Sequence, residues 1–305
     1  MPKYIFFRVQ QAFVTVLIVT AVIFVIIRLL GDPTHLMLPP EATEADRDLL
    51  RQEMGLSEPI AVQYLHFLGG LIQGDMGESY RFRRPAMEVV FERLGATLLL
   101  TCTSLGIGVL IGVPLGVAAA MRRDGVIDVA AKAVALFGQA GPPFLLALLL
   151  VRFFSVDLRW LPTSGYGTIE NLVLPALALG WYSAAGLVRL TRSSMLEVID
   201  SEYVKMARIK GLPARVVIYK HALKNASLPV ITFAGLQFGI LMGGAVAIEA
   251  IFAWPGVGKL ILDSISNLDF AVVQAAVTIS ALIFIGLNLA MDILYAVIDP
   301  RISLR

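Results

Sequence analysis

The side chains that most often do chemistry are few and scattered in this chain. Its three histidines, His35, His66 and His221, lie far apart and lack the short spacing that holds a metal ion. The single cysteine, Cys102, lies in an apolar run without ligand partners, so we expect a small buried side chain there. We therefore expect neither a catalytic residue nor a metal site.

The nucleotide-binding loop that would make this chain an ATPase is also missing from the sequence. Such a loop reads Gly-x-x-x-x-Gly-Lys-Ser/Thr, because its amides hold phosphates and its hydroxyl binds Mg²⁺. Gly258-Lys259 comes closest, but position 253 is Ala and Leu260 follows the lysine. We expect no ATP hydrolysis by this chain.

One polar segment, residues 191–227, carries helix signals of its own. From position 200 it reads Asp200-Ser-Glu-Tyr-Val-Lys-Met-Ala-Arg-Ile-Lys-Gly211-Leu-Pro213. Asp200 or Ser201 can cap a helix and Gly211 can end it, which predicts about nine or ten helical residues. Pro213 then opens a second helical stretch.

The predicted short helix is amphipathic. Tyr203, Met206 and Ala207 share one face, whereas Lys205 and Arg208 point elsewhere. Isolated helices shorter than about 12–15 residues are marginal in water, so something must pack on this one. We interpret it as a plug for a groove on a cytoplasmic partner. The alternative is a basic helix held on the membrane surface by anionic lipid, since eight lysines and arginines lie between positions 189 and 224.

The elements that must position this helix are membrane spans. Hydrophobic residues make up 57% of the 305 residues and charged residues 16%, with a mean hydropathy of +0.79, whereas soluble domains carry about 25% charged residues. This composition excludes a soluble enzyme, a disordered chain and a nucleic-acid-binding domain. A spanning helix needs roughly 20 consecutive apolar residues, and six stretches of about this length or longer predict an all-α polytopic membrane protein. They lie near 9–30, 95–120, 133–154, 172–190, 228–251 and 271–297.

The distribution of basic residues predicts that both termini are cytoplasmic. With that orientation the cytoplasmic segments hold fifteen of the 25 lysines and arginines, Arg122 and Arg123 among them. The short outer loops hold few, and the segment 31–94 is too long for the rule to apply. An even number of spans then returns the C-terminus to the cytoplasm.

These patterns divide the chain into three parts. Residues 1–30 form an N-terminal segment with the first span, residues 31–94 an extracytoplasmic helical segment, and residues 95–305 a core with five spans and the loop 191–227. The division follows composition, because only the second part resembles a soluble protein.

Two helices are expected in the extracytoplasmic segment. Thr43 and Asp46 resemble a capping box, and Gly55 can end the helix that they start. A second helix begins near Ser57, with an apolar side that we expect on the membrane surface. That side consists of Tyr64, Phe67, Leu68 and Leu71.

Small residues recur at every fourth position in two spans. One ridge consists of Ser104, Gly108, Gly112, Gly116 and Ala120, and the other of Gly235, Gly239, Gly243 and Ala247. Such ridges let helix backbones approach closely, so we expect both to contact other helices, inside this chain or across a subunit boundary. The alternative explanation is that glycine is common in transmembrane helices.

Few ionisable groups lie in the spans. Asp292 lies near the cytoplasmic end of the sixth span and Glu249 at the outer end of the fifth. An acid in a membrane is a functional candidate by default, although a structural partner or solvation at the helix end explains Asp292 equally well. Gln237 and Glu249 are our candidates for a pore or gate, with packing as the alternative.

The loop resembles a known family motif. Glu202-Tyr-Val-Lys-Met-Ala-Arg-Ile-Lys-Gly211, with Pro229 downstream, is similar to the EAA-type loop of permease subunits of ABC importers, in the dipeptide, oligopeptide, nickel and glutathione branch. Lys205-Met206-Ala207 stand where the general pattern has Glu-Ala-Ala. Further matches follow in the same order along nearly the whole chain, at Gly74-Asp-Met-Gly-Glu-Ser79, Leu161-Pro162 with Gly165, Leu174-Pro175, His221-Ala-Leu-Lys-Asn225, Trp254-Pro-Gly-Val-Gly258 and Asp299-Pro-Arg301.

The resemblance implies a type I importer permease with six spans in the bacterial inner membrane. It implies a homologous second permease, two cytoplasmic ATPase subunits that carry ATP and Mg²⁺, and an extracytoplasmic solute-binding protein as partners, with no cofactor on this chain and no nucleic acid. The coupling residues it points to are Glu202, Tyr203, Lys205, Met206, Ala207, Arg208, Lys210 and Gly211. The leading substrate class is di- or oligopeptides, with glutathione and nickel chelates as alternatives.

Two other classes of membrane protein remain as alternatives. A proton-coupled secondary transporter would use Asp292 or Glu249, but the sequence shows no internal inverted repeat with paired broken helices. A channel or scaffold would not need the capped loop helix. Sensitivity of uptake to ATP depletion separates the importer from both.

Overall fold

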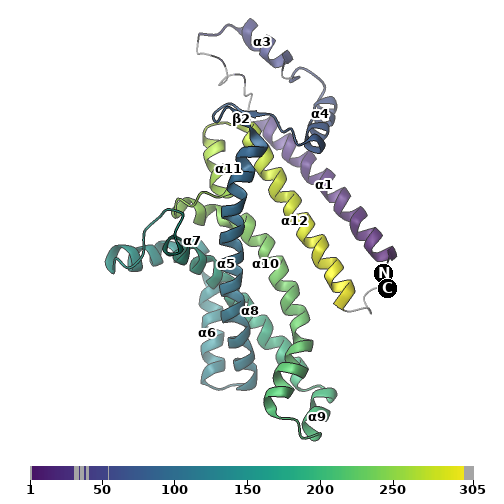
Figure 1. Cartoon of the computed structure of the whole chain (residues 1–305), viewed down its shortest axis with the longest axis vertical. Coiled ribbons are helices and arrows are strands. Elements are labelled where there is room, and N and C mark those ends of the chain that lie inside the picture. Colours follow the sequence, from purple (N-terminus) through teal and green to yellow (C-terminus); the bar gives the residue numbers. More distant parts are fainter. Residues whose placement is uncertain (1, 31–33, 35–37, 39–40, 54, 299–305) are drawn as a thin grey trace. The chain divides into compact units, whose positions relative to one another are not determined.

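The computed structural model describes residues 2–30, 34, 38, 41–53 and 55–298, and most of them lie in helices (Figure 1). The chain divides into two compact units, one of residues 1–96 with 255–305 and the other of residues 97–254. The long helix α5, Ala86–Met121, begins in the first unit and continues in the second.

The first unit is built on two long helices, α1 and α12, which lie side by side (Figure 1). Ile23 and Ile27 of α1 pack against Phe270 and Val273 of α12. Its elements are α1 (Pro2–Leu30), α3 (Glu44–Glu53), α4 (Ile60–Gln73), β1 (Glu78–Ser79), β2 (Arg84–Pro85), the start of α5, α11 (Val257–Ser266) and α12 (Phe270–Ile298). β1 and β2 pair antiparallel as a short hairpin.

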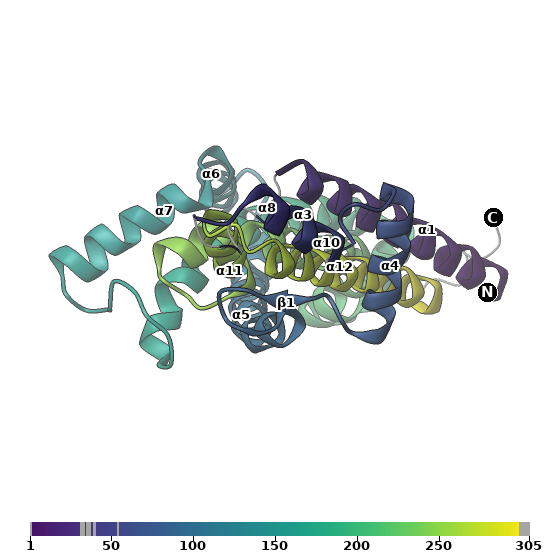
Figure 2. The ribbon, with the colours of Figure 1, turned by 90° about the horizontal axis from the view of Figure 1, so that it is seen from above.

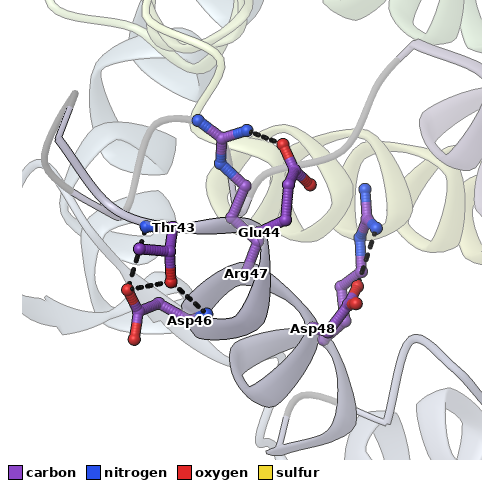
Figure 3. Close-up of polar contacts among 6 residues, drawn as sticks. Thr43, Glu44, Asp46, Arg47 and Asp48 are labelled. Atoms are coloured by element: carbon purple, nitrogen blue, oxygen red, sulfur yellow. Dashed lines mark hydrogen bonds and ion pairs between the residues drawn. The ribbon is translucent and has the colours of Figure 1, made fainter.

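The capping box predicted at the start of α3 is confirmed (Figure 3). The Asp46 carboxylate accepts a hydrogen bond from the Thr43 amide at 2.9 Å, and the Asp46 amide donates to Thr43 Oγ1 at 3.3 Å. Gly55, at φ +66°, turns the chain after α3, and the amide of Leu56 donates to the carbonyl of Arg51. Glycine suits that position because a left-handed conformation costs it nothing.

The apolar side of α4 packs on α1, which corrects the expectation that it lies on the membrane surface. Tyr64 donates its hydroxyl to the carbonyl of Leu17 at 2.9 Å and lies 2.9 Å from the hydroxyl of Thr20. The rings of Tyr64 and Phe67 both contact the ring of Phe24 of α1 in tilted arrangements, with centroids 5.5 and 5.6 Å away. This side faces protein and not lipid because the Tyr64 hydroxyl and the buried hydroxyl of Thr20 form a hydrogen bond with each other.

The second unit holds the remaining helices around α8, which is the most buried of the apolar helices. Its elements are the rest of α5, α6 (Val126–Ala140), α7 (Pro143–Leu150), the π-helix η1 (Val151–Asp157), α8 (Ile169–Ile199), α9 (Glu202–Ile209), the π-helix η2 (Val216–Ala222) and α10 (Leu223–Ile251). α8 packs on α6 and on α10. The segment 191–227 is thus continuous with two long helices.

The third predicted span, 133–154, is not one straight helix. α6 and the stretch from α7 through η1 meet at a bend of 101°, and Figure 2 views α6 nearly along its axis while α7 runs sideways from it. Gly141 and Pro142 adopt extended conformations, because a residue before proline is pushed out of the helical region and proline itself lacks an N–H. Among the residues that the structure describes, five helices are long and apolar enough to cross a membrane, and a sixth crossing results if the bent pair counts as one.

Cys102 is exposed on α5, which corrects its expected burial. Cys102 lies in a long transmembrane helix of high mean hydropathy, and hydropathy cannot tell a side that faces the core from one that faces lipid.

Candidate functional site

The short helix α9 begins directly after α8. Only Asp200 and Ser201 separate the two helices. Ser201 occupies the N-cap position in an extended conformation, and its carbonyl accepts the amides of Val204 and Lys205. Its hydroxyl donates to the carbonyl of Val198 at 2.5 Å, back onto α8, and makes no side-chain cap bond to α9. The helix α9 therefore begins after Ser201, one of the two predicted caps, while the Ser201 side chain forms a hydrogen bond to α8.

Gly211 ends α9, as predicted. Its φ of +74° lies in the left-handed region, and its amide donates to the carbonyl of Arg208 at 2.9 Å. A β-carbon at this position would meet no atom within 4 Å. The glycine is required by the backbone conformation and not by crowding. The helix has eight residues, slightly fewer than expected.

One side of α9 is anchored in the core of the second unit. Val204 is fully buried and Ala207 nearly so. They join a cluster formed by Val117, Ala120, Met195, Val217, Ala222 and Ala226, which come from α5, α8, η2 and α10. These contacts supply the packing partner that a helix this short needs. The expectation that Ala207 shares the face of Tyr203 and Met206 is wrong, because Ala207 points into this cluster.

The other side of α9 is an exposed apolar surface. Tyr203 is 44% exposed, Met206 55% and Ile209 80%, and Leu212 follows just beyond the helix. Sequence reasoning missed Ile209 and Leu212, although the spacing of 203, 206 and 209 at every third position was visible. We call Tyr203, Met206, Ile209 and Leu212 the α9 outer surface.

Charged side chains border the α9 outer surface. Lys205 donates to Glu202 at 2.8 Å, and both side chains are exposed. This hydrogen bond and the opposite charge lower the pKa of Glu202 and raise the pKa of Lys205, so both stay ionised at neutral pH. Arg208 and Lys210 are exposed as well. An apolar centre with a charged border is typical of a protein-docking surface.

The first small-residue ridge fixes α5 against α8, the helix that leads into α9. β-Carbons added at Gly108, Gly112 and Gly116 would lie 2.6–2.8 Å from the β-carbons of Ser183, Leu187 and Thr191. Real β-carbons do not approach so closely, so only glycine allows these two backbones to meet. Within this chain, the first ridge therefore lies directly against α8.

Two family models together match nearly the whole chain. Residues 112–304 match the model described as "Binding-protein-dependent transport system inner membrane component", and residues 1–101 match the model of the N-terminal part of such membrane components. The chain belongs to this family. It is a multi-pass component of the inner membrane and a permease subunit of an ABC importer.

Relatives and solved structures agree with the family assignment. The permease is 42% identical to the glutathione transport system permease protein GsiC of Salmonella typhimurium (strain LT2) and 40% identical to GsiC of Escherichia coli (strain K12), over the full length of both chains. It resembles the inward-facing MetNI methionine ABC transporter at a TM-score of 0.56, with 20% identity over 70% of this chain and 97% of that chain. An amino acid ABC transporter matches at a TM-score of 0.53, with 17% identity over 70% of this chain and 94% of that one. These two structures support the fold alone.

The second small-residue ridge of the permease differs from the first. Gly239 is buried and Gly235 half-buried, but Gly243 is exposed, and a β-carbon there would meet nothing within 4 Å. At Gly243 the ridge therefore contacts no other helix of the described chain. A subunit boundary, the other possibility raised by the sequence, stays a prediction.

The two candidates for a pore or gate are both buried in the permease. Gln237 is 4% exposed and Glu249 fully buried. Thr97 of α5 donates its hydroxyl to the Glu249 carboxylate at 2.7 Å, and the Trp254 amide donates to the Glu249 carbonyl at 2.8 Å. These bonds favour a packing role for Glu249 in the conformation seen here.

Asp292 faces a basic residue. Arg8 of α1 lies 3.3 Å from its carboxylate, and both side chains are partly exposed. An ion pair between two spanning helices explains this acid without a proton relay. The family assignment likewise does not favour the proton-coupled alternative.

A further buried cluster escaped the sequence analysis. Asp128 of α6 is fully buried, and Arg192 of α8 and Lys132 bind its carboxylate. These partners are 64 and 4 positions away. The i, i+4 spacing of Asp128 and Lys132 was a visible signal, whereas the pairing with Arg192 depends on how α6 packs on α8.

Proposed function

We propose that α9 is the coupling helix of this permease and that the α9 outer surface seats in a groove of a cytoplasmic ATPase subunit. The observation that carries the proposal is the division of α9 into two sides. Val204 and Ala207 hold it in the core, while Tyr203, Met206 and Ile209 stay exposed and apolar. Exposed apolar side chains on a firmly anchored helix are what a partner groove requires.

The anchoring gives a route for movement from the ATPase to the spans. α9 contacts α8 and η2, and it shares one close-packed cluster with Met195 of α8, Ala222 of η2 and Ala226 of α10. Packed cores do not deform continuously, so a displacement of α9 moves α8 and α10 together. ATP-driven closure of the ATPase pair would in this way switch the permease between inward- and outward-open forms.

The partners follow from the family and from the exposed surfaces. Binding-protein-dependent transport requires other subunits and a binding protein. We propose one homologous second permease, two ATPase subunits that bind ATP and Mg²⁺, and an orientation with cytoplasmic termini. Exposed Gly243 supports a close helix contact with the second permease. This chain would then form half of the translocation path.

We propose glutathione or a di- or oligopeptide as the transported solute. The support is the full-length similarity to the GsiC permeases. Uptake assays on proteoliposomes of the complete transporter test it: radiolabelled glutathione and a radiolabelled dipeptide should each be supplied, and at least one of them should accumulate when ATP is present. Failure of glutathione to enter while a dipeptide does would narrow the class to peptides.

The coupling proposal is tested by a pair of substitutions at one exposed position. Met206→Asp places a charge in the apolar centre of the α9 outer surface, so the ATPase subunits should copurify poorly and transport should fall at least tenfold. Met206→Leu keeps an apolar side chain of similar volume and should retain the subunits and most of the transport. Membrane insertion should be equal in both. Normal transport by Met206→Asp would refute the assignment.

A further inference from the structure

A cavity of about 460 Å³ lies between α6 and α8 in the second unit. Ala131 and Ala135 of α6 and Val188 of α8 form its buried apolar floor. Lys132, Arg189 and Arg192 stand around one end. Asp128 of α6 binds Arg192 of α8, whereas Gly138 lies against Ala185, so the two helices run antiparallel. The other end of the cavity therefore lies near Gln139 and Ala140, toward the bend of the third span.

The basic end of the cavity carries excess positive charge. Lys132 and Arg192 share one buried carboxylate, that of Asp128. Arg189 is exposed and has no ion-pair partner among the residues that the structure describes. Lys132 also lies 3.7 Å from the carboxylate of Asp124. Three cations with these two carboxylates leave a net charge of about +1 at the mouth of an apolar groove.

We propose that this cavity binds an anionic phospholipid of the membrane. Its phosphate would lie among Lys132, Arg189 and Arg192, and one acyl chain would follow Ala135 and Leu136 toward the bend. Basic pockets between transmembrane helices attract anionic head groups, and the apolar floor suits a hydrocarbon chain. The inference rests on the membrane location of the permease and does not require the coupling role of α9.

Charge complementarity favours lipid over a second protein helix. A helix seated here would match this charge only if it placed an acidic side chain at Arg189. A phospholipid carries its negative charge at the membrane surface already. The position of the basic residues fits, because α8 has 31 residues, or about 46 Å of helix, and its last turns extend past a hydrocarbon core of about 30 Å.

The test compares two arginine substitutions in the complete transporter. Samples purified in mild detergent are titrated with phosphatidylglycerol and with phosphatidylcholine, and bound lipid is counted by native mass spectrometry. Arg189→Gln should weaken phosphatidylglycerol binding roughly fivefold, the effect of one basic contact near a membrane surface, and leave phosphatidylcholine unchanged. Arg122→Gln removes the same charge from an exposed position outside the cavity and should bind as the native permease does. Equal binding by native and Arg189→Gln permease, or an equal loss in both variants, would overturn the proposal.

A photoreactive residue identifies the occupant directly. Leu136 lines the cavity and is 68% exposed, so benzoylphenylalanine can replace it with little disturbance. Illumination of the transporter in phosphatidylglycerol-containing nanodiscs should add the mass of one phospholipid to this chain. A crosslink to another subunit instead would mean that the cavity is a protein interface.

Discussion

Arg192 of α8 binds Asp128 of α6 through two hydrogen bonds, from Nε to one carboxylate oxygen and from Nη2 to the other at 2.9 Å. Asp128 is fully buried and also receives Lys132 Nζ and the amide of Asp124, each at 3.0 Å. The carboxylate thereby joins the turn after α5 to α6 and α8. A buried carboxylate with this many donors ties elements together because its removal leaves each donor unpaired.

Asp128→Ala should destabilise the permease by about 3 kcal/mol, because Arg192 and Lys132 would lose their shared anion. The measurement is the apparent melting temperature of the purified transporter in mild detergent. Asp128→Ala combined with Arg192→Gln should cost less than the sum of these two changes made singly, because the double variant no longer leaves the Arg192 charge without its anion. Additive losses would argue that the two side chains act independently.

Gly112→Ala should weaken the packing of α5 on α8. Its β-carbon would lie 2.6 Å from that of Leu187 and 3.0 Å from the carbonyl oxygen of Ala184, and overpacking of this kind costs about 1–3 kcal/mol. Gly106→Ala is the matched control in the same helix, because a β-carbon there meets nothing within 4 Å. The control should be neutral or slightly stabilising. Melting temperatures of the two variants that do not differ would contradict the backbone contact.

Val204 and Met206 should affect transport for different reasons. Val204→Ser replaces two buried methyl groups with a hydroxyl in the cluster that anchors α9, so α9 should lose hydrogen-exchange protection as well as coupling. Met206→Asp should lose coupling while α9 keeps its hydrogen-exchange protection, because the Met206 side chain lies on the exposed side of α9. Hydrogen exchange followed by mass spectrometry separates the two. Unchanged protection in Val204→Ser would show that α9 does not depend on this anchor.

Gly211 should tolerate asparagine better than valine. The obstacle at this position is the left-handed backbone, with φ at +74° and open space around the glycine. Asparagine visits that conformation at modest cost, whereas a β-branched residue is strained there. Transport by proteoliposomes should therefore be largely retained in Gly211→Asn and severely reduced in Gly211→Val, with both variants inserted normally. Equal losses in the two would point to a role for the bare glycine surface itself.

The capping box of α3 should make this helix sensitive to acid. Hydrogen bonds from the Thr43 hydroxyl and amide hold the pKa of Asp46 below its usual range. The folded pKa is lowered, so the carboxylate stabilises α3 above the ordinary aspartate pKa of about 3.9, and this stabilisation is lost as the pH falls through the folded value. Thr43→Ala should remove about 1 kcal/mol of capping at neutral pH. The measurement is limited proteolysis at neutral pH, in which Thr43→Ala should be cleaved faster than the native chain within residues 44–53. Identical cleavage of the two chains would contradict the capping role of Thr43.

The sequence by itself determined the elements and their class. Apolar runs of spanning length, the Thr43 and Asp46 pair, and Gly211 after a short amphipathic stretch all act within one or two helical turns, where local backbone chemistry decides the outcome. The structure confirms the α3 cap and both ends of α9 to within a residue or two. The six predicted spans correspond to five long helices and one bent pair among the residues that the structure describes.

Only the tertiary structure decided which apolar side chains face protein and which stay exposed. Tyr64 contacts Thr20 on α1, Ala207 packs into a buried cluster and not beside Met206, and Cys102 is exposed. In a membrane protein a core-facing, a lipid-facing and a partner-facing side are all apolar, so hydrophobic periodicity cannot separate them. The pairing of Asp128 with Arg192 across 64 positions was fixed by the packing of α6 on α8, for the same reason.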